Sequence, residues 1–299
     1  MTDVAVLSTP FLDLTFAGLK ELPPLGGERF ATDLIRSPGG GAITATGLAR
    51  LGLDTALAAP LGDDPSGAFL AAALRADGVR LVAPHDGPTA TTVVMPAHCD
   101  RAMVTFDPGV AVRRSDIDAL APSAVVCGVG QLEVLPEGTD AFVSVGDLEA
   151  QRYAQALPET LAGRTLIVNE AEALVLAGVD DAERAAHVLA GQVGTAVVTV
   201  GQRGAIAVSA GELFSAGGVD AGAAVDTTGA GDLFTAAYVW AGLRGMLTTE
   251  RLRWSVLYAS LSVTVPTATA GAVKESQLIE EAARHGLREA PSPSSAKER

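Results

Sequence analysis

Short apolar runs alternate with longer alanine-rich runs along most of this chain, and this alternation limits the folds that the chain can adopt. Later apolar runs, at residues 124–127, 141–145, 165–168 and 195–200, are nearly continuous, as expected for parallel strands covered on both faces. Runs such as 42–51 and 66–77 have the length of helices. Because strands that alternate with helices form βαβ units, the sequence predicts an α/β fold with a doubly wound, mostly parallel central sheet flanked by helices.

Two segments interrupt the alternation. Residues 10–36 contain prolines and a glycine pair between short β-capable pieces, and residues 89–106 contain the β-prone runs 91–95 and 102–106 without a crossover helix. We expect these segments to form a small β-sheet lid over a ligand site, although edge strands of the main sheet would show the same pattern. Residues 1–290 are thus expected to form a single domain, and residues 291–299, rich in Pro, Ser and charge, a disordered tail.

Composition excludes several classes of partner. The net charge of -14 would repel nucleic acid and anionic membranes, so we expect neither as a partner, and an anionic ligand would need a local pocket. The chain has no long uninterrupted apolar run and does not begin like a signal peptide, which favours a cytoplasmic protein. Cys99 and Cys127 lie in apolar surroundings typical of buried free thiols, and no His or Cys spacing typical of a zinc site is present.

Common catalytic signatures are also absent from the sequence. No lysine follows a glycine, as a P-loop requires, and Phe234 stands where a dinucleotide fingerprint starting at Gly229 would need its third glycine. The Gly-x-Ser-x-Gly elbow of hydrolases does not occur. These absences disfavour a P-loop NTPase, a Rossmann dehydrogenase and an α/β-hydrolase.

The stretch Asp226-Thr227-Thr228-Gly229-Ala230-Gly231-Asp232 is the strongest functional signal, because it leads directly into an apolar, helix-like segment. Small residues at 229–231 would let the free N–H groups of a helix N-terminus approach a phosphate closely. Asp232 would then lie beside that phosphate and could accept a proton from an attacking hydroxyl. The alternative is a glycine-rich turn in which Asp232 merely caps the helix.

Four weaker motifs have both a structural and a functional interpretation. Glycines at 39–41 precede the helix-like run 42–51 and would permit either a turn or a close approach to a ligand. The sequence at 62–67 is typical of a turn followed by a helix cap. Asn169 and Glu172, after a strand, could organise hydrated Mg²⁺ near phosphates or form a helix cap. Residues 199–204 could form a plain turn or a loop that carries a nucleotide.

Taken in order, these motifs make the chain similar to the ribokinase-like carbohydrate kinase family, also called the phosphofructokinase B type. The resemblance covers nearly the whole chain and rests on Asp13 and on residues 38–41, 50–52, 62–67, 169–172, 199–204 and 226–232. Each motif is weak by itself, whereas the ordered set is specific. The resemblance implies an α/β core with a small β lid, and transfer of the γ-phosphoryl group of ATP to a hydroxyl of a sugar or nucleoside.

The resemblance also implies roles for individual residues. Asp232 would be the catalytic base, and the backbone of Gly229, Ala230 and Gly231 the anion hole. The remaining roles are as follows: Asp13, Gly39, Gly40, Gly41 and Thr44 in substrate binding; Asn169 and Glu172 at the magnesium and phosphate positions, with Glu172 acting through water; Thr199, Gly201 and Gly204 in the nucleotide loop; and Asp226 and Thr228 at a monovalent cation site for K⁺, whose further ligands would lie near 266–275.

The sequence departs from the family at one substrate position. The family usually has an Asn in the glycine-rich start, and here either Ile43 or Thr44 stands in its place, depending on the direction of counting. Because a missing amide removes a partner for vicinal hydroxyls, ribose or fructose specificity does not carry over directly. We therefore expect a kinase of a small polyol, most plausibly a sugar or sugar acid, with a homodimer through the lid as one option.

Two alternatives remain open at this point. A nucleoside kinase on the same scaffold would use aromatic side chains to stack on a base, and Phe11, Phe16 and Phe106 lie in the lid segments. A non-catalytic nucleotide- or sugar-binding regulator could keep the same fold. The intact segment from Gly229 to Asp232 argues against a regulator, since a pure binder needs no base beside a phosphate.

Overall fold

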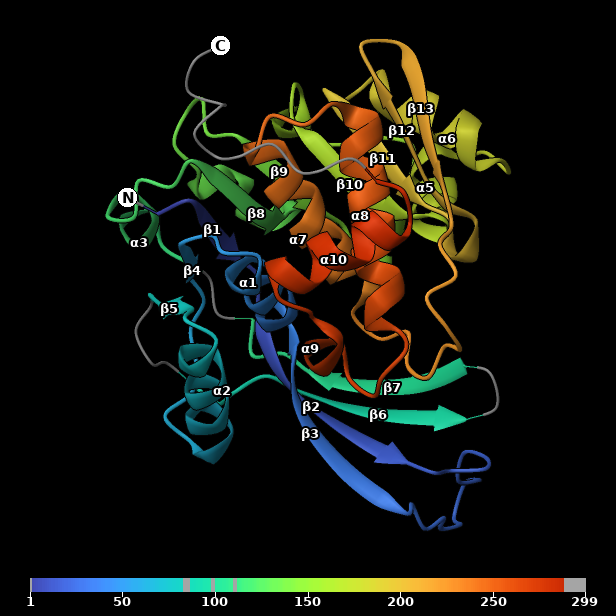
Figure 1. The fold of residues 1–299 in the computed structure, drawn as a ribbon. Helices are drawn as coiled ribbons and strands as arrows, with labels where there is room; N and C mark the ends of the chain where they lie inside the picture. The colour runs from blue at the N-terminus through green and yellow to red at the C-terminus, as the bar shows by residue number, and fades with distance from the viewer. Residues whose placement is uncertain (1, 83–86, 98–99, 110–111, 288–299) are drawn as a thin grey trace.

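Two separate sheets organise the chain (Figure 1). The computed structural model describes residues 2–82, 87–97, 100–109 and 112–287. Cys99 and the expected tail at 291–299 lie outside these residues. A large, mostly parallel sheet flanked by helices and a small separate sheet confirm the predicted fold class. Within the described ranges, no helix combines the length and apolar character needed to cross a membrane.

The large sheet has nine strands in the order β13-β12-β11-β10-β9-β8-β1-β4-β5. Pairing is parallel from β5 to β11 and antiparallel from β11 to β13. The strands are β1 (Val4–Leu7), β4 (Thr55–Leu57), β5 (Arg80–Leu81), β8 (Ala124–Gly128), β9 (Ala141–Ser144), β10 (Thr165–Asn169), β11 (Thr195–Thr199), β12 (Gly204–Ser209) and β13 (Glu212–Gly217). The sequence of β1, VAVL, is fully buried because helices cover both faces of the sheet.

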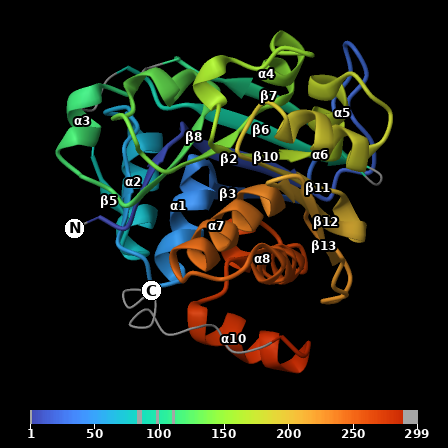
Figure 2. The ribbon, with the colours of Figure 1, turned by 90° about the horizontal axis from the view of Figure 1, so that it is seen from above.

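Helices form a layer on each side of this sheet, as the view from above shows (Figure 2). One layer contains α3 (Arg114–Asp118), α4 (Asp147–Arg152), α5 (Glu170–Ala177) and α6 (Ala182–Ala190), and the other contains α1 (Gly41–Arg50), α7 (Ala230–Leu243), α8 (Thr248–Ser262) and, outermost, α10 (Glu275–Arg284). Short helices α9 (Ala268–Gly271), η1 (Val129–Val134), η2 (Glu159–Leu161) and η3 (Gly201–Arg203) complete the core. Cys127 lies in β8 as a buried free thiol, as predicted.

The small sheet has four strands in the order β3-β2-β6-β7. They are β2 (Pro10–Ala17), β3 (Asp33–Gly40), β6 (Thr91–Ala97) and β7 (Asp100–Phe106). Helix α2 (Pro65–Ala76) packs against β2 through Leu12, Leu70 and Ala71. Residues 38–40, for which the sequence allowed either a turn before a helix or a close approach to a ligand, pair with β2 as the end of β3 and so do not form a turn. An antiparallel partner strand overrides the turn preference of these glycines because it satisfies their backbone groups.

The side chain that caps helix α2 also binds the chain at the entrance to the small sheet. Asp64 is the N-cap of α2, where its Oδ1 accepts from the N–H of Gly67 at 2.8 Å. The same carboxylate accepts from the N–H and the hydroxyl of Thr89, just before β6. These hydrogen bonds lower the pKa of Asp64. The turn and cap chemistry expected for residues 62–67 thus also fixes the point where the chain enters the small sheet.

Candidate active site

Helix α7 begins in the segment with the strongest functional signal. Gly229 is the N-cap and has a left-handed backbone with φ 75. A Cβ at this position would lie 2.5 Å from the Cβ of Ala268 and 2.6 Å from Cδ1 of Ile43. Only glycine therefore fits, both for its backbone conformation and for its contacts. The first N–H groups of a helix have no partner within the helix, and in α7 the N–H of Ala230 makes only a long contact of 3.4 Å to the carbonyl oxygen of Thr227, so this helix start can present N–H groups to an anion.

Asp232 lies in the first turn of α7 and is not its cap. Its Oδ1 accepts a hydrogen bond of 3.0 Å from the hydroxyl of Thr44 in α1, which is 188 residues away in sequence. Burial raises the pKa of Asp232 to about 6, while the Thr44 hydroxyl opposes the shift and the charge of Glu172 adds to it. A carboxylate with such a pKa is well placed to act as a general base near neutral pH.

Asp13 in β2 is a second buried carboxylate at this site, with 7% of its surface exposed. Burial raises its pKa to about 7, and the charges of Asp232 and Asp226 add to the shift. Asp13 also explains Gly39, because a Cβ there would lie 2.2 Å from both carboxylate oxygens. The structure thus brings together two predicted acids from opposite ends of the chain.

The two candidate positions for the missing Asn differ in their surroundings. Thr44 contacts Asp232, whereas Ile43 is buried and packs beneath Gly229. Gly40 and Gly41 are explained by close backbone packing: a Cβ at Gly40 would meet the ring of Phe11, and one at Gly41 would lie 2.2 Å from the carbonyl oxygen of Ser8. Of these residues, Thr44 is therefore the one whose side chain reaches the catalytic candidate.

A cavity of about 830 Å³ adjoins the N-terminus of α7. Six of the predicted site residues line it: Asn169, Thr199, Gly201, Gly204, Ala230 and Gly231. Its other walls were not foreseen from the sequence. They include Val219, Ala221 and Ala224 before α7, and Val256, Ala259, Ser260 and Val263 in and just after α8. The helical spacing of these last four small residues is the one signal that could have identified this wall.

Asn169 and Glu172 form the capping box of α5. The Asn169 N–H donates to Oε2 of Glu172, and the Glu172 N–H donates to Oδ1 of Asn169, both at 2.9 Å. Burial raises the pKa of Glu172, and the nearby charges of Asp147 and Glu149 add to the shift. Among the described residues, no group of three or more His, Cys, Asp or Glu is arranged to hold a metal directly. The capping interpretation is correct, and it leaves the Glu172 carboxylate beside two further acids.

Asp226 joins the loop before α7 to a segment near α9. Its Oδ1 accepts from the N–H of Thr228 at 2.9 Å, and its Oδ2 accepts from the N–H of Thr267 at 3.1 Å. Within the described chain, the Thr228 hydroxyl oxygen is buried without a hydrogen-bond partner. Thr267 has the unusual positive φ of 66 and caps α9. A buried hydroxyl oxygen without a hydrogen-bond partner, next to a carboxylate, can supply oxygen ligands to a cation.

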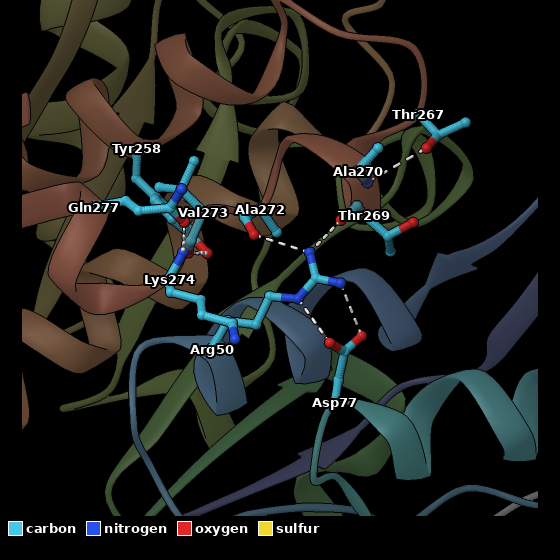
Figure 3. Close-up of polar contacts among 10 residues, drawn as sticks. All are labelled: Arg50, Asp77, Tyr258, Thr267, Thr269, Ala270, Ala272, Val273, Lys274 and Gln277. Carbon is cyan, nitrogen blue, oxygen red and sulfur yellow. Dashed lines mark hydrogen bonds and ion pairs between the residues drawn. The ribbon is translucent and has the colours of Figure 1, made fainter.

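Arg50 anchors this same α9 segment to α1 and α2 (Figure 3). Its guanidinium forms a two-pronged ion pair with Asp77, the C-cap of α2, at 2.7 and 3.0 Å. Its Nη1 donates to the carbonyl oxygens of Thr269 and Ala272. Ala268 in this segment packs against Gly229, so the hydrogen bonds of Arg50 hold in place a residue that contacts the candidate anion hole.

The strand register shows which residues of the small sheet share the face of Asp13. Ser37, Asp13, Thr92 and Thr105 lie opposite one another across β3, β2, β6 and β7. Side chains alternate between faces along a strand. Phe16 and Phe106 are displaced by an odd number of residues from Asp13 and Thr105, so they lie on the opposite face of the small sheet, whereas Phe11, two residues before Asp13, lies on the same face as Asp13.

The comparisons with known proteins agree with this geometry. A family model described as "pfkB family carbohydrate kinase" matches residues 31–275, and no curated protein matches the chain. Among solved structures, Arabidopsis thaliana ribokinase complexed with ribose and ATP is 24% identical, with 93% of this chain and 98% of that chain covered and a TM-score of 0.76. Giardia lamblia ribokinase is 19% identical, with 95% and 100% covered and a TM-score of 0.80.

The adenosine kinase of Sinorhizobium meliloti is also similar in structure, at 20% identity with 96% of this chain and 99% of that chain covered and a TM-score of 0.74. At these identities the structural likenesses establish the fold. The family model, by contrast, spans well over half of the sequence, from within the small sheet to the start of α10. The chain therefore belongs to the pfkB family of carbohydrate kinases.

Proposed function

We propose that this protein is an ATP-dependent kinase that phosphorylates a hydroxyl group of a small sugar or sugar acid. One observation carries the proposal: Asp232 directly follows Ala230 and Gly231, which line the cavity, and its carboxylate contacts Thr44 beside a second buried acid, Asp13. A base at the junction between an anion-binding helix start and a polar acceptor pocket is the arrangement that phosphoryl transfer requires.

In the proposed reaction the acceptor oxygen attacks the γ-phosphorus of ATP while its proton passes to Asp232. The new O–P bond forms as the bond to the β–γ bridging oxygen breaks, and its electron pair leaves with ADP. The N–H groups at the start of α7, around Gly229 and Gly231, stabilise the charge on the transferred group. Closure of the small sheet over the site would exclude water and so suppress hydrolysis of ATP.

The acids near the cavity fit a magnesium ion that is held through water. Glu172 is oriented by Asn169 and lies near Asp147 and Glu149, and Mg²⁺ prefers oxygen ligands while keeping several of its waters. Bound there, Mg²⁺ would neutralise phosphate charge. Asp226 and the orphaned hydroxyl of Thr228 fit a monovalent cation such as K⁺ next to the anion hole.

The lid face favours a sugar over a nucleoside as the acceptor. Asp13 lies in a row of small polar side chains, Ser37, Thr92 and Thr105, whose hydroxyls can bind a polyol. Phe16 and Phe106 lie on the other face, so neither can stack on a base placed beside Asp13. Phe11 lies on the same face as Asp13, with its ring next to Gly40, and is the one of the three aromatic residues that keeps the nucleoside alternative open.

The test is ADP formation in the presence of ATP and Mg²⁺ across a panel of sugars, sugar acids and nucleosides. We expect turnover with a sugar or sugar acid, and a loss of about 10²-fold or more in kcat for Asp232→Asn. Glu183→Gln, the same carboxyl-to-amide change at an exposed acid of α6, serves as the control. Turnover of nucleosides alone would select the nucleoside kinase. ATP binding without turnover of any acceptor would select the non-catalytic regulator.

We propose further that two copies of the chain pair through the lid. The edge strand β7 exposes Met103, Val104 and Phe106, with 52%, 65% and 53% of their surfaces accessible. Exposed apolar side chains on a sheet edge favour pairing with another chain. Light scattering coupled to size-exclusion chromatography should give twice the chain mass of 30.3 kDa, and a monomer at micromolar concentration would contradict the proposal.

A further inference from the structure

Gly229, the N-cap of α7, lies in a slot between two elements from distant parts of the chain. A Cβ at position 229 would lie 2.6 Å from Cδ1 of Ile43 in α1 and 2.5 Å from the Cβ of Ala268 in α9. The two walls of the slot are thus α1 and α9. Because the N–H groups that follow Gly229 are the proposed binding site of the transferred phosphoryl group, the spacing of these walls affects where those groups point.

Arg50 connects the two walls of this slot. It is the last residue of α1, and its Nη1 donates hydrogen bonds to the carbonyl oxygens of Thr269 and Ala272, 219 and 222 positions away in sequence (Figure 3). Thr269 belongs to α9, and Ala272 is the C-cap of α9. The end of a helix leaves carbonyl oxygens without partners and favours a cation, so a guanidinium suits this position. Arg50 therefore fixes α9 relative to the helix that carries Ile43.

The α9 segment has little stability of its own. It is a helix of four residues, far shorter than an isolated helix needs to be stable. Its N-cap, Thr267, has a φ of 66, a left-handed conformation that is costly for a residue with a β-branched side chain. The N–H of Thr267 donates to Oδ2 of Asp226, which precedes Gly229 in the same loop. The segment therefore depends on contacts from outside, and it meets the anion-hole loop at two points, Thr267 and Ala268.

Asp77 holds the guanidinium of Arg50 in turn. Its two carboxylate oxygens accept from Nε and Nη2 of Arg50 at 2.7 and 3.0 Å. Asp77 is the C-cap of α2, a helix with Leu70 and Leu74 fully buried and with Asp64 as its N-cap. A two-pronged ion pair with a firmly packed helix keeps the planar guanidinium in one orientation. In that orientation Nη1 is directed at the two carbonyl oxygens of the α9 segment.

We propose that Arg50 is a positioning residue for phosphoryl transfer, which sets the width of the slot around Gly229 and so the direction of the N–H groups at the start of α7. This inference rests on the proposed kinase function. Among the described residues that line the cavity, neither Arg50 nor Asp77 occurs, so the effect on the phosphate is indirect. Without the guanidinium, α9 is free to shift away from α1, and N–H groups that no longer point at the γ-phosphoryl group lose their charge-assisted hydrogen bonds with it.

The experiment compares nucleotide affinities and needs no knowledge of the acceptor. Isothermal titration calorimetry in the presence of Mg²⁺ measures the Kd of a non-hydrolysable ATP analogue and of ADP for wild type, Arg50→Met and Arg50→Lys. ADP lacks the phosphoryl group that the start of α7 is proposed to bind. The ratio of the two Kd values therefore reports on the anion hole, whereas a general loss of stability leaves this ratio unchanged.

Two control variants separate positioning from stability. Arg80→Met removes another arginine that pairs with a carboxylate, that of Asp54 at 3.0 Å, on the edge strand β5 of the large sheet. Leu189→Ala removes a fully buried side chain of α6, which lies on the opposite side of the large sheet from α1 and α7. The second change lowers the stability of the fold without touching the slot. Both controls should keep the wild-type ratio of the two Kd values.

We expect Arg50→Met to weaken binding of the analogue by about 10-fold, the order of one hydrogen bond to a charged group, with the Kd of ADP changed by less than about twofold. Arg50→Lys keeps the charge but not the planar fork, so it should raise the ratio by about threefold, and it carries the test if Arg50→Met does not fold. An unchanged ratio, equal weakening of both nucleotides, or the same change in Leu189→Ala would overturn the positioning role alone. A wild-type protein that binds neither nucleotide would overturn the kinase function and the inference with it.

Discussion

Replacement of Asp13 by Asn should stabilise the free protein at alkaline pH while removing acceptor binding. The pKa of Asp13 is raised from 3.8 to about 7, chiefly by burial and then by the charges of Asp232 and Asp226. A raised pKa means that the folded state disfavours the charged carboxylate. Asp13 therefore lowers the free energy of unfolding at pH values above its folded pKa, and this penalty is absent below about pH 3.8, where both states are protonated.

The size of the effect follows from the shift. A difference of about three pKa units corresponds to roughly 4 kcal/mol at pH values above the folded pKa. Because neighbouring acids share part of this repulsion, we take about 2–4 kcal/mol for Asp13 itself. More than half of the penalty develops between about pH 5 and pH 8, because the unfolded-state carboxyl is already ionised there while the folded-state carboxyl keeps its proton up to about pH 7. For a chain of this length, 1 kcal/mol corresponds to about 2 °C in Tm.

The assay is thermal unfolding of wild type and Asp13→Asn at pH 5 and pH 8 without ligands. The Tm difference in favour of the variant should be about 2–5 °C larger at pH 8 than at pH 5. Asp33→Asn, a change of an exposed acid in the lid strand β3, is the control and should show no such pH dependence. A Tm difference for Asp13→Asn that does not grow with pH would show that burial and neighbouring acids do not act on Asp13 as argued.

Three further predictions follow from the contacts at the site. Gly229→Ala should lower the free energy of unfolding by about 2–4 kcal/mol, because position 229 combines a left-handed backbone with two close contacts to a Cβ. Gly231→Ala, whose Cβ meets open space, should fold normally but bind an ATP analogue more weakly. Thermal unfolding with and without the analogue distinguishes these two outcomes. Arg50→Met should lower the free energy of unfolding by about 2–4 kcal/mol, because it leaves the carboxylate of Asp77 without its partner and the two side chains are only 23% and 22% exposed. A double-mutant cycle with Asp77→Asn, measured by chemical denaturation, should give a coupling energy above about 1 kcal/mol. Thr44→Val should move the acid limb of the pH profile of kcat/KM to higher pH, because the Thr44 hydroxyl lowers the pKa of Asp232; an unmoved limb would mean that Asp232 is not the titrating base.

Local chemistry could be predicted from the sequence because the residues involved are close in the chain. The capping box of Asn169 and Glu172 and the cap at Asp64 are contiguous patterns, and the structure contains both. A helix directly after the glycine-rich segment was also expected, and α7 begins inside that segment, at Ala230. The order of such motifs was enough to indicate the family, since the fold determines their order along the chain.

Contacts between distant segments could not be predicted in the same way. The hydrogen bond from Thr44 to Asp232 and the one from Arg101 to Thr227 depend on how α1, α7 and the small sheet come together. Counting from the glycines or from Gly52 left Ile43 and Thr44 equally possible at the Asn position. Only packing separates them, because the Ile43 side chain supports Gly229 from below and Thr44 reaches the carboxylate.

The raised pKa values share this non-local origin, and they bear on how the site works. Asp13 and Asp232 are both buried, the charge of Asp232 raises the pKa of Asp13, and the charge of Glu172 raises the pKa of Asp232. A cluster of acids alone would repel a nucleoside triphosphate. Cations must therefore enter the site with the nucleotide, which is the role proposed for Mg²⁺ and K⁺. The same repulsion between the acids lowers the stability of the ligand-free protein. Binding of the nucleotide together with its cations should therefore raise the free energy of unfolding by more than the direct contacts of the nucleotide contribute.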